Sequence, residues 1–193
     1  MHIHLEKKGI RAFGVAESFK EGFGSKSILG GVVMRSDLIV DGFIFGSPTI
    51  KGDDASDEIV NIFNRLGRND INVVLVSGLI ISMYNIIDID YVANSINTPV
   101  IGITFKDSRG LEEHIKRHFP KFYDKKIEAY RRLGKREIIR LQTGYTLYVR
   151  AKRLTIDETK KVLNKFTIQG AIPEPIRLAK LLAKAKLEFL FRK

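Results

Sequence analysis

The alternation of apolar and polar positions predicts a mixed α/β fold. Short runs of β-branched and aromatic residues favour strands, and apolar residues three or four apart favour helices. In the first half this gives strands at 11–16, 27–35, 38–45, 73–77 and 100–104, and helices at 54–66 and 89–96. Three meandering strands thus precede alternating strands and helices, an order that predicts a mixed sheet with helices on its faces. The apolar stretch 71–82 is expected to be a buried strand that runs into a loop.

The second half continues the alternation. Its predicted elements are helices at 109–134, 155–166 and 173–191 and strands at 137–142 and 145–149. Pro120 is expected to break the first of these helices, Gly134 to end it, and Thr143-Gly144 to form a hairpin turn. Thr155 begins a capping box. The chain shows no repeat or linker, so we expect a single domain over residues 1–193.

Composition and charge narrow the function classes. The chain of 193 residues has no Cys, which excludes disulfides, thiolate metal sites and cysteine nucleophiles. With no targeting segment and no apolar run of about 20 residues, we expect a cytoplasmic protein rather than a membrane protein. The 33 Lys and Arg outnumber the 22 Asp and Glu, and the excess lies in the second half: residues 1–105 have a net charge of −3 and residues 106–193 one of +14. This asymmetry favours a polyanionic partner, nucleic acid above all.

Carboxylates are the candidate catalytic residues. Glu17 follows the first strand, and Asp53, Asp54 and Asp57 stand at the start of the first helix. At one edge of a mixed sheet such acids can converge and hold Mg²⁺, which activates water for phosphodiester hydrolysis. The alternative is that the three aspartates only cap the helix, because free N–H groups and the helix dipole favour acids at its N-terminus. The residues alone favour the capping role.

Histidines and glycines offer weaker candidates. His114 and His118 lie one helical turn apart, a spacing that suits zinc, but no third ligand follows and a solvated basic face is favoured. The segment 22–27 (GFGSKS) lacks the earlier glycine of a phosphate loop, because Phe19 occupies that place, and a strand rather than a helix follows it. Neither feature is taken as a site.

Basic residues form the candidate nucleic-acid-binding surface. They gather after the long helical segment and on one face of the last helix: Arg131, Arg132, Lys135, Arg136, Arg177, Lys180 and Lys184. Tyrosines that can stack on bases are interleaved with them: Tyr123, Tyr130, Tyr145 and Tyr148. Apolar residues of the last helix are expected to pack inward: Ile176, Leu182, Phe189 and Leu190.

Four segments resemble a known archaeal family. The segment GAIPEPIRLAK at 170–180 is similar to the IPEPLR-x-A motif of endonuclease dU, a family related to endonuclease V. GVAESF at 14–19, IKGDDASDEI at 50–59 and the stretch 74–103 resemble further family segments in the same order. The resemblance covers nearly the whole chain, and IPEPIR is its most specific part.

The resemblance implies a ribonuclease H-like fold, in which three antiparallel strands precede parallel strands and helices. It also implies metal-dependent phosphodiester cleavage near a deaminated base such as deoxyuridine, as in DNA repair. Under this resemblance Glu17 and Asp54 are the expected catalytic residues. They would hold Mg²⁺ or Mn²⁺, with Asp57 or Asp88 as further ligands, and DNA is favoured over RNA as the partner.

The chain also departs from the pattern of endonuclease V. Acids of that family align with Ala16 and Ser77, and its acid or His after the PEP-R motif aligns with Lys180. Glu17, next to Ala16, is expected to face the opposite side of a regular strand. Only Asp54 stands where a helix-start carboxylate is expected. Because Mg²⁺ sites depend on carboxylate charge, three functions stay open: a metal-dependent endonuclease, a nucleic-acid-binding protein without the chemistry, and a scaffold that binds an acidic protein surface.

Overall fold

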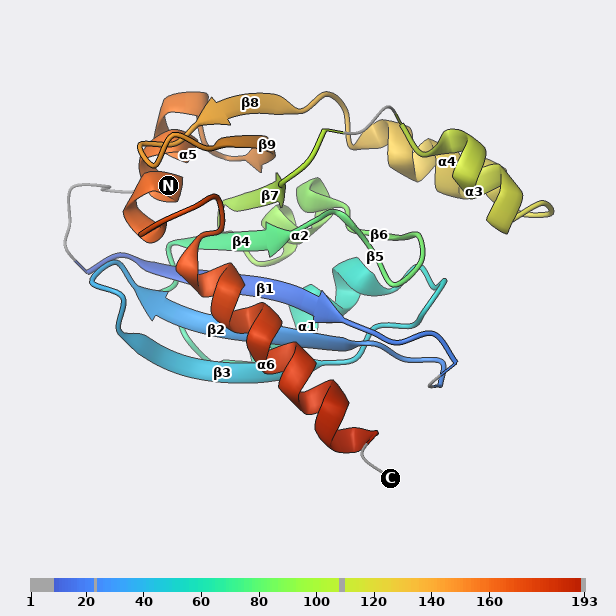
Figure 1. Ribbon diagram of the computed structural model, residues 1–193, viewed down its shortest axis with the longest axis horizontal. Coiled ribbons are helices and arrows are strands. Elements are labelled where there is room, and N and C mark those ends of the chain that lie inside the picture. Colours follow the sequence, from blue (N-terminus) through green and yellow to red (C-terminus); the bar gives the residue numbers. More distant parts are fainter. Residues whose placement is uncertain (1–8, 23, 108–109, 192–193) are drawn as a thin grey trace.

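Seven strands form one mixed sheet in the order β3-β2-β1-β4-β7-β9-β8 (Figure 1). The computed structural model describes residues 9–22, 24–107 and 110–191. The strands of the sheet are β1 (Arg11–Ser18), β2 (Ile28–Arg35), β3 (Val40–Gly46), β4 (Val73–Ser77), β7 (Val100–Thr104), β8 (Glu137–Arg140) and β9 (Thr146–Lys152). β1, β4 and β7 are parallel, whereas β2, β3, β9 and β8 run antiparallel to their neighbours. This order confirms the predicted antiparallel strands followed by parallel ones.

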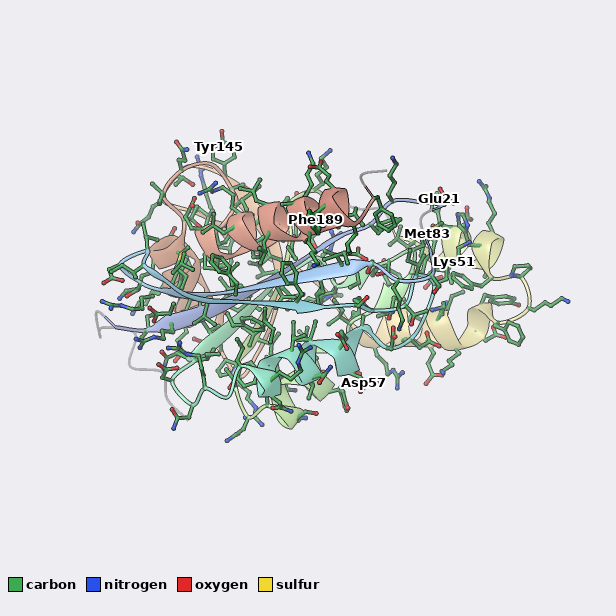
Figure 2. The ribbon with its side chains drawn as sticks, turned by 90° about the horizontal axis from the view of Figure 1, so that it is seen from below. Glu21, Lys51, Asp57, Met83, Tyr145 and Phe189 are labelled. Atoms are coloured by element: carbon green, nitrogen blue, oxygen red, sulfur yellow. The ribbon has the colours of Figure 1, made fainter. Side chains whose placement is uncertain are left out.

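Helices cover both faces of the sheet. The helices are α1 (Ala55–Arg65), α2 (Ile89–Ser95), α3 (Glu112–His118), α4 (Tyr123–Arg132), α5 (Ile156–Phe166) and α6 (Glu174–Leu190). Figure 2 shows α6 and α1 on opposite sides of the sheet, with α3 and α4 beyond one end. Side chains alternate accordingly along β1, since Ala12 and Ala16 join the core under α5 and α6, and Phe13 and Val15 join the core under α1 and α2. In the described ranges no helix has the length and apolar character needed to cross a membrane.

The last helix lies unusually close to the first two strands. A Cβ atom on Gly14 would lie 2.4 Å from the carbonyl carbon of Pro175, and one on Gly30 would lie 2.4 Å from the carbonyl oxygen of Ala179. Only glycine permits this approach, because any other residue would overlap the backbone of α6. The IPEPIR segment therefore has a packing role at the start of α6, against β1.

The structure confirms most of the predicted elements and corrects two predictions. The long helical segment is broken around Pro120 as expected, and the capping box of Thr155 and Glu158 is formed. The prediction of a plain loop after β4 is incomplete, because that segment contains a hairpin of β5 (Ile80–Ile81) and β6 (Asn85–Ile86). The inward packing predicted for Phe189 and Leu190 is wrong: their exposed fractions are 73% and 50%. Both lie in the last turn of α6, where the helix extends past the core.

Candidate functional site

Glu17 lies near the carboxyl end of β1 and faces the α1 side of the sheet, as strand alternation predicts. Its carboxylate accepts two hydrogen bonds from Ser82, one from the backbone N–H at 2.9 Å and one from the hydroxyl. The Ser82 hydroxyl also bonds to the hydroxyl of Ser27 at 2.8 Å, and both serines are fully buried. Glu17 is therefore fixed against the turn between β5 and β6.

Asp54, the residue before α1, binds the other end of the same hairpin. Its carboxylate accepts hydrogen bonds from Asn85 Nδ2 at 2.7 Å, from the N–H and hydroxyl of Thr49 at 2.9 and 2.6 Å, and from Lys26 Nζ at 3.4 Å. Burial raises the pKa of Asp54, but these hydrogen bonds outweigh it and lower the pKa from 3.8 to about 2. The expected capping bond to α1 is not formed by this side chain. Asp54 instead holds a loop and a hairpin together.

The turn between Glu17 and Asp54 has an uncommon backbone conformation. Ser82, Met83 and Tyr84 have φ angles of 45°, 55° and 72°, in the left-handed region that non-glycine residues rarely adopt. Each such residue costs about 1–3 kcal/mol, and residues of this kind cluster at active sites and ligand-binding segments. The strained turn and the two candidate carboxylates therefore lie in one hydrogen-bonded cluster at the end of β1.

Lys126 of α4 joins this cluster from a buried position. Its side chain is 7% exposed, and Nζ donates to the carbonyl oxygens of Tyr84 and Gly52 at 2.9 and 2.8 Å and to Asp53 Oδ1 at 2.7 Å. Burial raises the pKa of Asp53, but the bonds and charges of Lys126 and Lys125 outweigh it, so that the pKa is lowered. Sequence reasoning missed Lys126, because it resembles every other lysine of a basic helix.

Asp57 and Asp88 lie in a second group, between α1, α2 and α4. Asp57 Oδ1 accepts the hydroxyl of Tyr91 at 2.7 Å. Asp88 is the N-cap of α2 and accepts the N–H groups of Asp90 and Tyr91, each at 3.0 Å. Asp57 and Asp88 line a cavity of about 340 Å³ together with Arg132. These two carboxylates therefore have local structural partners of their own.

The predicted ligands do not fit a Mg²⁺ or Mn²⁺ site. Within the described part of the chain, no three His, Asp or Glu side chains lie close enough together to hold one ion. The oxygens of Asp54 already accept several protein hydrogen bonds, and the ammonium of Lys26 lies beside them. His114 and His118 likewise belong to no such group of three in these residues.

The opposite face of the sheet supplies no carboxylate at the positions that align with endonuclease V. Ala16 is buried in the core under α6. Ser77 follows Leu75 of the same core by two residues, so it faces the same side. Lys180 is exposed on α6. The structure therefore places the retained acids, Glu17 and Asp54, at the end of the sheet on the α1 side.

The predicted basic residues divide into paired and unpaired cations. The ion pairs are Arg131–Glu112, Arg136–Asp107, Arg177–Glu174 and Lys184–Glu188. Glu112 and Arg131 shift each other's pKa, the carboxyl downward and the guanidinium upward, chiefly through their hydrogen bond. Among the residues that the structure describes, Arg132, Lys135 and Lys180 form no ion pair. Only part of the basic surface is thus available to an anion.

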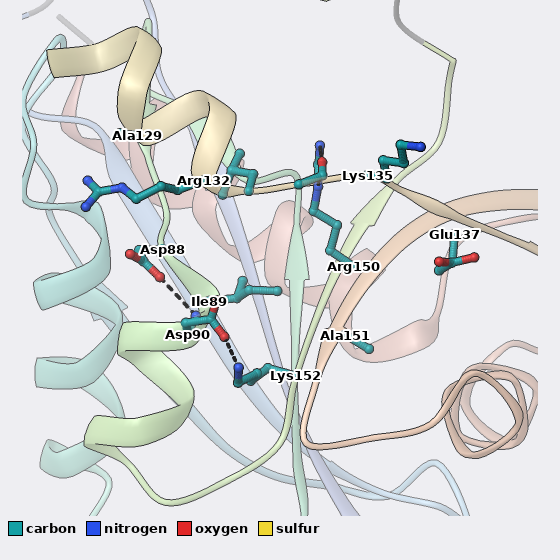
Figure 3. A pocket seen from close by; sticks show the side chains of 12 residues that line it. Asp88, Ile89, Asp90, Ala129, Arg132, Lys135, Glu137, Arg150, Ala151 and Lys152 are labelled. Atoms are coloured by element: carbon teal, nitrogen blue, oxygen red, sulfur yellow. Dashed lines mark hydrogen bonds and ion pairs between the residues drawn. The ribbon is translucent and has the colours of Figure 1, made fainter. Parts of the chain in front are cut away.

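Two of the unpaired cations line a cavity of about 600 Å³ between the end of α4, the start of α2 and β9 (Figure 3). We call it the α4–β9 groove; the charged residues that line it are Asp88, Asp90, Arg132, Lys135, Glu137, Arg150 and Lys152. Arg150 is half-buried and donates from Nε and Nη2 to the carbonyl oxygen of Gly134 at 3.0 and 2.8 Å. Sequence reasoning missed Arg150, because a lone arginine within a predicted strand gives no signal.

Comparisons with known proteins agree with this architecture. A UPF0215 protein of Pyrobaculum calidifontis is 35% identical over 182 residues, which cover 93% of this chain and 98% of that protein. One of Pyrococcus horikoshii is 32% identical over 187 residues and covers 95% of both chains. A solved protein of unknown function from Archaeoglobus fulgidus has a TM-score of 0.79 at 26% identity and covers 92% of this chain and 98% of that one.

Endonuclease V has the same fold. The Ciona intestinalis enzyme, solved with a DNA that contains an inosine followed by a ribo-adenosine, matches with a TM-score of 0.61 at 15% identity over 95% of this chain and 87% of that one. This likeness confirms the predicted ribonuclease H-like fold. The family model described as "Endonuclease dU" matches residues 8–187. The chain therefore belongs to the endonuclease dU family.

Proposed function

We propose that this protein binds nucleic acid, with DNA preferred to RNA. The observation that supports the proposal is a set of cations around the α4–β9 groove that have no carboxylate partner among the residues the structure describes: Arg132, Lys135 and Arg150. Contacts between Lys or Arg and phosphates supply much of the affinity of proteins for nucleic acid. The DNA complex of the Ciona endonuclease V, which shares this fold, is consistent with such a partner.

The second candidate function is metal-dependent cleavage of nucleic acid near deaminated bases such as deoxyuridine. Family membership favours it, and so does the approach of Glu17 and Asp54 to one strained hairpin at the end of β1. Because the described residues do not fit a metal site, we assign no step of cleavage to them. Under this candidate, Mg²⁺ or Mn²⁺ would need ligands beyond this pair, such as substrate phosphates.

Binding is tested by fluorescence anisotropy with labelled single-stranded DNA, duplex DNA and RNA at increasing NaCl. We expect the dissociation constant to rise steeply with salt, because each protein–phosphate contact releases counterions. DNA should bind more tightly than RNA of the same length. An affinity that does not change with salt would contradict the proposal. A pull-down that retains the same protein partner after nuclease treatment would instead support the scaffold.

Cleavage is tested with a nuclease-free preparation on DNA that contains deoxyuridine or deoxyinosine, with Mg²⁺ or Mn²⁺. Glu17→Gln is the matched variant, since it keeps the size of the side chain but removes its charge. Cleavage that the wild type performs and Glu17→Gln loses would support the second candidate. No cutting of any substrate with either metal would remove it and leave the binding proposal standing.

A further inference from the structure

Arg150 is a half-buried guanidinium beside a like charge. It lies next to Arg136, and the only partner of its donors in the described residues is the carbonyl oxygen of Gly134. Burial lowers the pKa of Arg150, and the charge of Arg136 adds to this effect. Arg136 has its own partner in Asp107, at 2.8 Å. No carboxylate of the described residues neutralises Arg150, and an anion bound in the groove would supply the missing negative charge.

Most acids in the groove are already engaged. Asp88 accepts two backbone N–H groups of α2, and Asp90 forms an ion pair with Lys152 (Figure 3). Glu137 also lines the cavity, and Figure 3 shows its carboxylate at the end away from Asp88 and beyond Lys135. The remaining charge on the walls is therefore positive, since Arg132, Lys135 and Arg150, which form no ion pair in the described part of the chain, outnumber Glu137.

The strand surface beside Arg150 suits a nucleobase. Side chains alternate along β9, so Tyr148 and Arg150 lie on the same side of the sheet. The Arg136 guanidinium lies 5.2 Å from the centre of the Tyr148 ring, and Ile138, which pairs with Tyr148 across the sheet, is 66% exposed. An aromatic ring next to cations is the arrangement that single-stranded nucleic acids bind by stacking. Residues two apart along a strand are separated by about 6.6 Å, so a phosphate at Arg150 and a base at Tyr148 can belong to neighbouring nucleotides.

We propose that the α4–β9 groove binds a phosphodiester of single-stranded nucleic acid. Arg150 is the anchor inside the groove, Arg132 and Lys135 contact the phosphate from its rim, and Tyr148 stacks on the adjoining base. The inference rests on the proposed function and narrows it to one face of the protein. It includes Arg150, which sequence reasoning missed, and gives no role to Arg131, which Glu112 neutralises.

The test compares two pairs of charge-removing substitutions. Arg132→Gln with Lys135→Gln removes two exposed cations from the groove. Lys160→Gln with Lys161→Gln removes two exposed cations from α5, on the other face of the sheet. Binding of a labelled single-stranded oligonucleotide is measured by anisotropy at several NaCl concentrations. We expect the groove pair to weaken binding about tenfold or more and to reduce the salt slope by about two. The α5 pair should change affinity less than about twofold.

The outcomes separate this inference from the proposed function. If the wild type binds no nucleic acid, the proposed function fails. If it binds, and both pairs weaken binding equally, nucleic-acid binding stands and the groove is wrong. Inorganic phosphate serves as a competitor: displacement of the oligonucleotide at low phosphate concentration would show a site for a small anion instead of a strand.

Arg150→Lys provides an independent measurement. It retains the charge but loses the planar fork that bonds a phosphate through two N–H groups. We expect about three- to tenfold weaker binding with an unchanged salt slope, because the number of charges is the same. Thermal unfolding shows whether the loss of the bonds to Gly134 affects stability. Unchanged affinity in a folded Arg150→Lys would overturn the role of Arg150 as the anchor.

Discussion

The two basic regions of this protein lie on different faces of the sheet and differ in how their charges are used. On α6, Arg177 and Lys184 are paired with Glu174 and Glu188. Around the α4–β9 groove, Arg132 and Lys135 have no paired acid in the described residues. Both regions look alike when basic residues are counted along the sequence. The difference shows that the availability of a cation depends on its tertiary partners.

The two faces also differ in how closely the backbone packs and in its conformation. The α6 face is built for close packing, since α6 lies on two strand glycines. The α1 side holds a polar cluster with a strained turn, buried serines and the carboxylates of Glu17 and Asp54. We therefore expect substitutions under α6 to change stability and substitutions around α4 to change binding. Substitutions on each face test this division.

Gly14→Ala should have the largest effect, on stability. The added methyl group would overlap the backbone of Pro175, so β1 and α6 must separate, at a cost of about 3 kcal/mol. Gly42→Ala in β3 is the matched control, because a Cβ there meets no atom within 4 Å. Urea unfolding of both variants gives the free energies. Equal stabilities would show that α6 does not depend on this contact.

Arg177→Gln should destabilise the protein by about 2 kcal/mol, because it leaves the carboxylate of Glu174 without its partner. The side chain of Glu174 is only 8% exposed. The double variant Glu174→Gln with Arg177→Gln should regain part of this loss, since no uncompensated charge remains. Thermal unfolding measures both. A stable single variant that binds nucleic acid more weakly would place Arg177 among the binding residues and break the division between the faces.

Lys180→Gln with Lys184→Gln should leave nucleic-acid binding within about twofold of the wild type, because these lysines lie on the α6 face. The same change at Arg132 and Lys135 should cost about 1.4 kcal/mol or more, which corresponds to a tenfold change in affinity. Anisotropy titrations at one salt concentration compare the two. Equal losses from both pairs would mean that the bound strand contacts both faces.

Substitution of Asp54 should give the smallest effect, which is expected in the pH dependence of the free energy of unfolding. Its folded pKa of about 2 lies below the usual 3.8, so it adds stability above pH 3.8 that is lost as the pH falls through about 2. The side chain is 39% exposed, and solvent screening reduces this contribution to about 1 kcal/mol. Asp54→Asn should lose less stability than the wild type across this range, as measured by urea midpoints. Parallel curves would show that the hydrogen bonds of Asp54 do not favour its ionised form.

The fold could be predicted from the sequence wherever an element was long enough to show its period. The alternation in β1 predicted even the side of the sheet that Glu17 faces. β5 and β6 could not be predicted, because two residues show no alternation. The exposed positions of Phe189 and Leu190 were missed for different reasons. Helical spacing places Leu190 in line with Ile176, but it lies in the last turn of α6, past the core. Phe189 lies about 140° around the helix from Ile176, so it is on the outward face.

The candidate site could be predicted only as a list of residue types. Glu17 and Asp54 were identified, but their partners Ser82 and Asn85 lie 65 and 31 residues away along the chain. The fold alone brings these groups together and decides that the carboxylates bind protein donors. Whether a basic residue is paired with an acid or unpaired also depends on tertiary contacts. One example is the contact between Arg131 and Glu112, which are 19 residues apart.

Lys126 has a consequence for the order in which parts of the molecule open. One ammonium group binds the carbonyl oxygens of Tyr84 and Gly52, so α4 cannot detach without releasing the hairpin turn and the segment before α1. Segments joined in this way exchange their amide hydrogens as one cooperative unit. The amides of α4, including those near Arg132, should therefore exchange at the rate of the hairpin rather than at the faster rate of a peripheral helix. We therefore expect α4, which lies beside the groove, to unfold locally no more often than the hairpin turn that Lys126 holds.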